Sequence, residues 1–164
     1  MNPLVEEASK KAAIAWVAFG GPAYAVWCLP LEGKLYVISG PGEQDLPGLA
    51  DALSTESRAT VSLRGDHGGR IVSFDAAITE IHSNGTEFET VAPQLAQKRL
   101  NASGTTEEVV ARWARDCVLI SLEAQETVQT PDDSESEAPR PATVLRATRK
   151  PFRLHRVKKR AKKR

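Results

Sequence analysis

Residues 33–49, GKLYVISGPGEQDLPGL, decide the fold. The apolar run Leu35-Tyr36-Val37-Ile38 predicts a strand over Lys34–Ser39. A Gly-rich loop, residues 39–44, follows it, and a short helix opens at Leu46-Pro47 and ends near Leu53. A strand that ends at glycines beside a helix start can present backbone N–H groups to an anion. The alternative is a tight connection in which the glycines supply positive φ, and the lack of a GK[ST] ending favours that alternative.

Further strands are predicted on both sides of this stretch. Residues 23–29 alternate, with Tyr24, Val26 and Cys28 on one face and Ala25, Trp27 and Leu29 on the other. Residues 58–64 form a half-buried strand whose inward side chains are Ala59, Val61 and Leu63. A hairpin loop at 65–69 leads to a long strand, 70–81, and residues 118–122 form a last, buried strand.

Three helices complete the predicted domain. Asn2 caps the first, whose apolar residues recur at helical spacing through Trp16 until residues 19–22 end it. The second covers residues 88–99, where Pro93 is expected to be tolerated only near a helix start. The third begins at the capping box formed by Thr105 and Glu108.

The charge of the 164-residue chain is divided sharply along its length. Residues 1–123, the expected folded domain, carry −6; residues 124–139, an expected disordered acidic linker, carry −5; residues 140–164, an expected disordered basic tail, carry +12. Cys28 and Cys117 lack metal-type spacing and are expected to be reduced. No apolar run is long enough to span a membrane and no secretory signal opens the chain, so a cytoplasmic location is expected.

The order of these segments resembles the pyridoxamine 5′-phosphate oxidase-like split-barrel family, which includes FMN-binding oxidases and deazaflavin-dependent reductases. The similar segments are Val26-Trp27-Cys28, Gly33-Lys34-Leu35-Tyr36, Ser39-Gly40, Leu49, Arg58-Ala59-Thr60-Val61 and, near the end, Trp113 to Leu122. The resemblance covers roughly residues 23–123. It implies a mainly β, α+β fold: an antiparallel six-stranded Greek-key split barrel flanked by helices, usually a homodimer with flavin at its interface. The family's first strand is missing or poorly recognisable before Phe19.

The resemblance also implies where a flavin would bind. FMN or a deazaflavin would contact Trp27, Ser39, Gly40, Gly42, Gln44 and Arg64. In an ungapped comparison, Glu43, Gln44 and Asp45 take the places of the family's phosphate-binding Ser, Arg and Lys. Two carboxylates near a phosphate oppose its binding, since like charges about 4 Å apart repel by about 4 kcal/mol at an effective dielectric constant near 20.

The residues themselves leave several interpretations open. Gln44, Arg64 and Arg70 are the polar side chains best placed to reach a ligand. The end of an alternating strand favours a solvent-exposed Arg64, however, and Trp27 fits a core or interfacial position at least as well. Neither His67 nor His82 has a partner at metal-ligand spacing, so no metal site is expected. No hydrolase motif is present, and no catalytic residue is identified.

Two functions therefore compete. One is a flavin-dependent oxidoreductase of unknown substrate, in which the cofactor carries the chemistry. The other is a barrel that has lost its cofactor and acts as a non-enzymatic binding or scaffold module. A homodimer is expected because Trp27, Tyr36 and Phe74 would lie exposed on strands. The basic tail is a candidate for non-specific nucleic-acid binding, and pairing with the acidic segments is the alternative.

Overall fold

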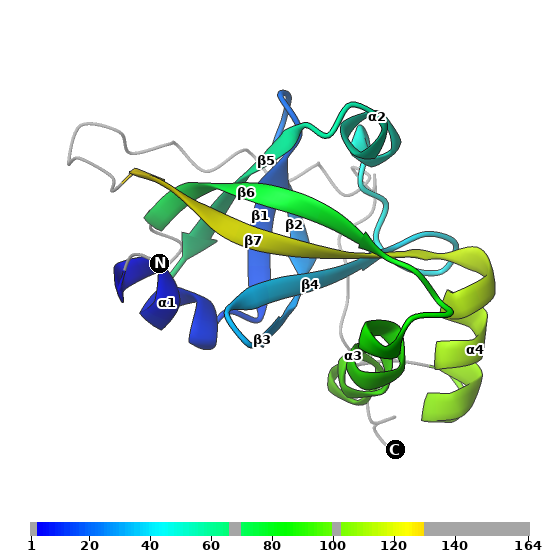
Figure 1. The fold of residues 1–164 in the computed structure, drawn as a ribbon. Helices are drawn as coiled ribbons and strands as arrows, with labels where there is room; N and C mark the ends of the chain where they lie inside the picture. Colours follow the sequence, from blue (N-terminus) through cyan, green and yellow to red (C-terminus); the bar gives the residue numbers. More distant parts are fainter. Residues whose placement is uncertain (1–2, 66–69, 100–102, 130–164) are drawn as a thin grey trace, which may run out of the picture.

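The computed structural model describes residues 3–65, 70–99 and 103–129 (Figure 1). The elements follow in the order α1 (Pro3–Lys10), β1 (Ile14–Ala18), β2 (Tyr24–Trp27), β3 (Leu29–Leu31), β4 (Lys34–Ser39), α2 (Leu49–Ser54), β5 (Arg58–Arg64), β6 (Arg70–Ile81), α3 (Thr86–Lys98), α4 (Thr106–Asp116) and β7 (Val118–Gln129). The predicted Asn2 cap, the centre of the 65–69 loop and the basic tail lie outside the described residues.

The strands form one antiparallel sheet in the order β2-β1-β5-β6-β7-β4-β3. The two end strands are consecutive in the chain, so the sheet curls into a barrel with a single seam. β2 pairs with β1 and β3 pairs with β4, and Cys28 joins them across the seam. The predicted α+β split barrel is confirmed, but the sheet has seven strands rather than the expected six, because the segment over residues 24–31 is divided at Cys28 into β2 and β3.

Two apolar cores lie on opposite faces of β4 and β7. Leu35 and Val37 of β4 point into the barrel with Ile120 and Leu122 of β7, where Val5 of α1 and Leu49 of α2 join them. Figure 1 shows α1 and α2 on opposite sides of the curled sheet. A strand buried on both faces reads as an unbroken apolar run, which explains the sequence of β4.

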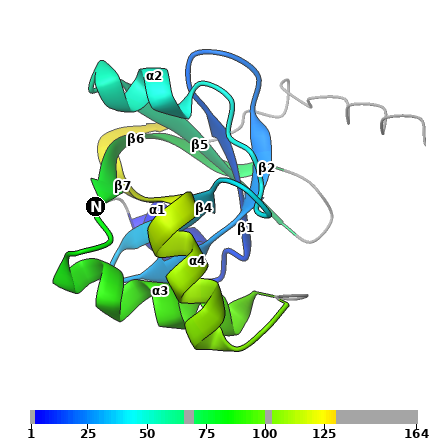
Figure 2. The ribbon, with the colours of Figure 1, turned by 90° about the vertical axis from the view of Figure 1, so that its right-hand side faces the viewer.

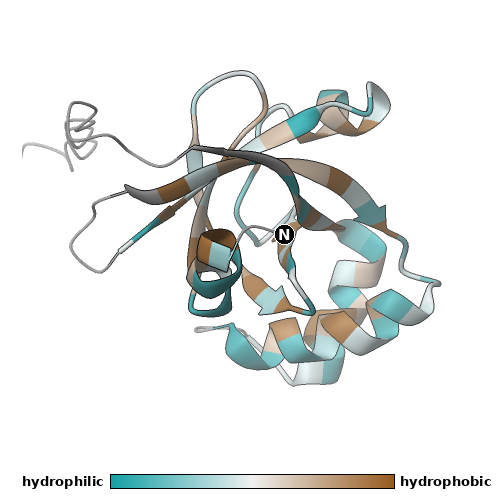
Figure 3. Cartoon of the chain, turned by 60° about the vertical axis from the view of Figure 1, so that its left-hand side comes forward, coloured by the Kyte–Doolittle hydropathy of each residue, from teal (hydrophilic) through white to brown (hydrophobic). Residues whose placement is uncertain are grey.

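The second core joins the outer face of the sheet to the helical pair α3 and α4. Its members include Tyr36 and Ile38 of β4, together with Leu95 and Trp113 from the helices. Figure 2 shows this pair at the end of the barrel opposite α2, and polar and apolar residues alternate along the helices in Figure 3. Packing of the apolar face keeps α3 helical through Pro93, so the expectation that this proline must lie near a helix start is wrong.

Three other expectations are corrected. Residues 14–18 are strand β1 rather than helix, and Ala15 and Val17 are buried in the barrel. β7 continues to Gln129, beyond the expected domain end at Glu123, because residues 124–129 extend its pairing with β6. Tyr36 and Phe74, each 3% exposed, are core residues and do not support a homodimer.

The strands over 34–39, 58–64 and 70–81 have the predicted bounds. Ala59, Val61 and Leu63 point inward as expected. The capping box of Thr105 and Glu108 is also confirmed, with both reciprocal hydrogen bonds present.

Candidate functional site

The Gly-rich loop after β4 folds tightly against α4. Gly40 has φ +146°, and a Cβ there would lie 2.9 Å from Cys117 Cα; Gly42 has φ +80°, and a Cβ there would lie 2.8 Å from Arg112 Nη1. Both positions therefore require glycine. The backbone N–H of Glu43 donates to the Gly40 carbonyl at 2.9 Å, and Ser39 Oγ accepts from the Leu46 N–H at 3.2 Å. These bonds fix the loop's shape, and the Ser39 hydroxyl oxygen is already engaged by the protein's own backbone.

Gln44 fastens the loop to the edge strand β2. Its Oε1 accepts from the Trp27 backbone N–H at 2.8 Å, and its Nε2 donates to the Ala25 carbonyl at 3.0 Å. The side-chain amide thus pairs with β2 as another strand would. An edge strand covered in this way no longer offers those groups to a second chain.

Glu43 is the centre of a buried charge cluster. Its side chain is 0% exposed, and Oε1 accepts from Arg112 Nη2 at 2.6 Å and from Trp113 Nε1 at 2.8 Å. Oε2 forms an ion pair with Arg99 Nε at 2.7 Å. Because two guanidinium groups neutralise this carboxylate, Glu43 does not present an unpaired charge to a ligand as the sequence comparison suggested.

The same two arginines hold the loop's main chain. Arg112 Nη1 donates to the Pro41 carbonyl at 2.7 Å, and Arg99 Nη2 donates to the Gly42 carbonyl at 2.9 Å. This part of the loop therefore directs carbonyl oxygens at cations. Its geometry favours the tight-connection interpretation over a backbone anion site at Pro41 and Gly42.

A hollow of about 730 Å³ lies beside the loop. Its walls come from the link between α1 and β1, from β2 and β3, from the loop and from the end of α3. The lining residues are Lys10, Lys11, Ala12, Ala13, Ile14, Trp27, Cys28, Pro30, Gly42, Glu43, Gln44, Lys98 and Arg99. The hollow brings together three of the expected cofactor residues, Trp27, Gly42 and Gln44.

The hollow joins an apolar wall to a basic margin. The Trp27 ring is tilted against Trp113, with ring centroids 6.1 Å apart and an interplanar angle of 40°. Lys10 and Lys11 form exposed ion pairs with Glu6 and Glu7, at 2.8 and 2.7 Å. Such i,i+4 pairs contribute only about 0.3–0.5 kcal/mol, so either lysine can turn to a ligand anion at little cost. Lys98 is exposed and makes no ion pair or hydrogen bond with any residue that the structure describes.

The remaining expected site residues lie elsewhere. Ser39 and Gly40 begin the loop, and neither lines the hollow. Arg64 stacks over Trp16, 4.5 Å from its ring centroid, at the end of β5 and outside the hollow. The backbone of Arg70 begins β6, but the description does not extend to its side chain.

Four basic residues that line the hollow were not expected from the sequence. Lys10 and Lys11 close the first helix, whereas Lys98 and Arg99 close the second, and nothing in their spacing links the two pairs. One signal was present: basic residues are favoured at helix C-termini, so the end of α3 was a place to look. Bringing these ends together required knowledge of the barrel seam.

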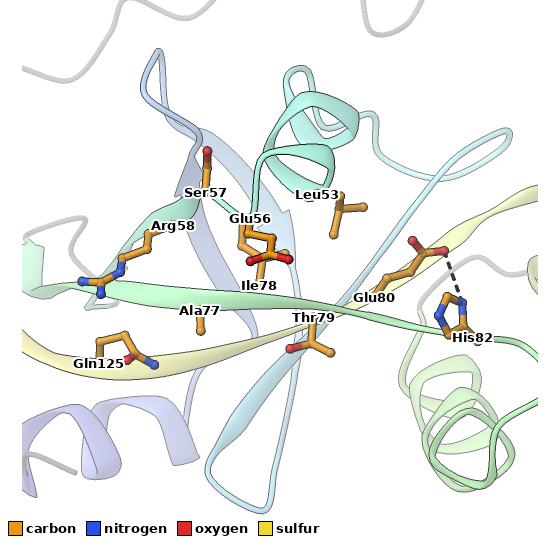
Figure 4. Close-up of a pocket in the computed structure, with 10 residues that line it drawn as sticks. All are labelled: Leu53, Glu56, Ser57, Arg58, Ala77, Ile78, Thr79, Glu80, His82 and Gln125. Carbon is orange, nitrogen blue, oxygen red and sulfur yellow. Dashed lines mark ion pairs between the residues drawn. The ribbon is translucent and has the colours of Figure 1, made fainter.

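A second hollow of about 540 Å³ lies between α2 and β6 (Figure 4). Glu56, Arg58 and Gln125 line it, and an ion pair of 3.8 Å joins Glu80 to His82 at one end. It lacks an aromatic wall and has mixed charge. In the described ranges, no group of three or more His, Cys, Asp or Glu residues could hold a metal ion.

The Cys28 thiol, which lines the 730 Å³ hollow, does not titrate near neutral pH. Burial raises the pKa of Cys28 to about 12, and its Sγ lies 3.7 Å from the Ala12 carbonyl oxygen. The thiol therefore stays protonated and acts as a small apolar group.

Within the described residues, no helix is long and apolar enough to cross a membrane.

Comparison with solved structures supports the architecture. The heme storage protein HutZ from Vibrio cholerae matches 79% of this chain and 93% of its own, with a TM-score of 0.56 and 12% identity. For a conserved hypothetical protein from Mycobacterium tuberculosis, the match covers 80% of this chain and 85% of that protein, with a TM-score of 0.57 and 15% identity. For a putative pyridoxamine 5′-phosphate oxidase from Listeria innocua, the match covers 76% of this chain and 92% of that protein, with a TM-score of 0.51 and 12% identity.

At these identities the likeness extends to the fold alone. No protein-family model matches the sequence, and the comparison with curated proteins gives no significant match. The chain thus shares its split-barrel fold with the putative pyridoxamine 5′-phosphate oxidase.

Proposed function

We propose that this split barrel binds a flavin nucleotide in the 730 Å³ hollow, with the ring system against Trp27 and the phosphate among Lys10, Lys11 and Lys98. The observation that carries the proposal is the combination of an aromatic wall with lysines at the margin of one hollow. Ligand sites are mostly apolar, with a few charged groups that fix orientation. The order of the chain's segments, similar to that of flavin-binding barrels, supports the same ligand.

The donor set fits a phosphate outside the Gly-rich loop. Arg99 and Arg112 are already bound to Glu43, and the exposed carboxylate of Asp45 opposes an anion at the loop. Lysine ammonium groups bind phosphate as point charges and tolerate varied geometry. The three lysines are therefore the groups that would hold the phosphate, and the loop would only shape one wall.

A bound flavin would supply hydride and electron transfer, which are chemistry of the cofactor itself. The chain's own residues would bind and orient it. Trp27 would cover one face of the ring, Ile14 and Pro30 would exclude water, and Gln44 would hold the β2 backbone in place. The protonated Cys28 thiol offers no base near neutral pH. On this proposal, any oxidoreductase activity depends on the flavin and takes its acid or base from the substrate or solvent.

Flavin is favoured over heme by the composition of the hollow. Among the described residues, the lining contains no histidine, the usual neutral imidazole ligand of heme iron. The competing function is a cofactor-free binding or scaffold module. The pairing of Arg99 with Glu43 favours this second candidate, since Arg99 is the arginine that lines the hollow and would bind phosphate most strongly.

Isothermal titration calorimetry of the purified full-length chain tests the proposal. FMN should bind, riboflavin should bind about tenfold more weakly because it lacks the phosphate, and hemin should not compete. Deazaflavin nucleotides should bind at the same place as FMN. Absence of heat with every flavin would favour the cofactor-free module, and hemin binding that FMN cannot displace would contradict the proposed ligand.

Variants localise the site. Lys98→Ala should weaken FMN binding about tenfold, the usual cost of losing one hydrogen bond to a charged group. Arg58→Ala removes a cation from the second hollow and is the matched control, so its FMN affinity should equal that of the wild type. Equal losses in both variants would indicate non-specific attraction.

A further inference from the structure

Glu43 is unusual because it is fully buried on a loop that is otherwise largely exposed. Its carboxylate accepts from the Arg112 guanidinium and the Trp113 indole, and it pairs with the Arg99 guanidinium. Two guanidinium groups face one carboxylate, so the cluster retains an excess positive charge. Removing one member of such a buried group leaves charges without compensation.

Two hydrogen-bond donors and one ion-pairing guanidinium together would suit a small oxyanion. Guanidinium groups match the geometry of carboxylate and phosphate oxygens, and an indole N–H adds a neutral donor. Trp113 is 0% exposed, and its position in the second core fixes the direction of the N–H. Thus packing in the helical pair holds the indole donor in place, and hydrogen bonds to the Pro41 and Gly42 carbonyls hold the two guanidinium groups.

We propose that Arg99, Arg112 and Trp113 Nε1 form an oxyanion site whose resident anion is the protein's own Glu43 carboxylate. The occupied site excludes external phosphate from the arginines and ties the Gly-rich loop to α3 and α4. Without the carboxylate, the same donors bind a free carboxylate or phosphate. This inference does not depend on flavin binding.

The site has a path to solvent. Glu43 and Arg99 both line the 730 Å³ hollow, and the Arg99 and Arg112 side chains are 18% and 30% exposed. A small anion can therefore reach Arg99 from that side once the resident carboxylate is gone. Glu43→Ala deletes a methylene and a carboxylate, which together correspond closely to one acetate ion.

Chemical rescue of the full-length Glu43→Ala chain tests the proposal. Its melting temperature should be below that of the wild type and should rise with acetate along a saturation curve, at ionic strength held constant with chloride. Inorganic phosphate should act in the same way. The wild type and Asp45→Ala, which loses an exposed carboxylate next to the loop, should not respond to acetate beyond the effect of chloride, and phosphate should stabilise both of them less than it stabilises Glu43→Ala.

Two further variants keep the test decisive. Glu43→Gln fills the space with a neutral amide and should show no acetate response, and Glu43→Ala with Arg112→Leu should lose the response. If Glu43→Ala does not fold alone, acetate or phosphate should restore its folding from urea. The proposal would be overturned if neither anion raised the melting temperature of Glu43→Ala or restored its folding from urea. Equal gains in melting temperature in the Asp45→Ala control would also overturn it.

Discussion

Gln44 Oε1 accepts the backbone N–H of Trp27 at 2.8 Å, so a residue of the Gly-rich loop completes the hydrogen bonding of the edge strand. Gln44→Ala removes this bond and the one to the Ala25 carbonyl. We expect a loss of about 1–2 kcal/mol in the free energy of unfolding, measured with urea, and faster hydrogen exchange at the Trp27 amide.

The control for that experiment is Gln94→Ala, which removes one exposed side-chain bond to the Thr90 carbonyl within α3. It should leave Trp27 exchange unchanged. Unaltered exchange at Trp27 in the Gln44 variant would show that the loop does not hold β2.

Alkaline pH should destabilise the fold through Cys28. Burial raises its pKa from 9.0 to about 12 in the folded state, so between these values the unfolded chain loses a proton that the folded chain keeps. Stability is therefore fully present below about pH 9 and falls as the pH rises toward 12. Burial, together with the hydrogen bond to Glu87, also raises the pKa of Tyr36 and acts in the same direction.

Urea unfolding across this pH range measures the effect. Cys28→Ala should reduce the loss of stability with rising pH, whatever its stability at neutral pH. Alkylation of Cys28 in the wild type should be slow until the protein unfolds. A decline of the same slope in wild type and Cys28→Ala would contradict the assigned origin.

A homodimer remains our expectation, now on different grounds. Ile14, 55% exposed on the outer face of β1, is one of two large hydrophobic side chains exposed among the described residues. Light scattering should give a dimer mass for the wild type at micromolar concentration and a monomer mass for Ile14→Lys. A monomeric wild type would exclude the dimer at that concentration.

The basic tail should supply any affinity for nucleic acid. A chain truncated after Gln129 keeps all of β7 and loses the segment that carries +12. We expect the full-length chain to bind duplex DNA and structured RNA at low salt, with at least roughly tenfold weaker binding at physiological salt, and the truncated chain to bind neither. Equal binding by both chains would place the affinity in the barrel.

The barrel strands were predictable because their patterns are local. The unbroken run in β4 and the alternation in β5 each reflect the faces that their residues bury. β1 was missed because Ala12, Ala15 and Trp16 also fit a helical period, and only pairing with β2 and β5 selects the strand. Propensity over so few residues cannot decide between two periods.

The site was predictable only in part. The loop and Trp27 could be identified from the order of the segments, and both border the hollow. The partners of Glu43 could not, since Arg112 is far away in sequence and its role depends on how α4 packs against the loop. The Glu43 carboxylate, expected from the sequence to repel a ligand phosphate, is instead paired with two arginines inside the protein. Only the tertiary structure distinguishes these two roles.

The most direct test of the proposed function is the fluorescence of FMN on titration with the full-length chain. Contact with Trp27 should quench the flavin, and Trp27→Leu should bind roughly fivefold more weakly with less quenching, since an aromatic contact contributes about 0.5–1.5 kcal/mol. Trp16→Leu, which alters a tryptophan outside the hollow, should behave as the wild type. FMN fluorescence that stays unchanged at protein concentrations up to roughly millimolar, or that is quenched equally by the Trp27 variant, would contradict binding in this hollow.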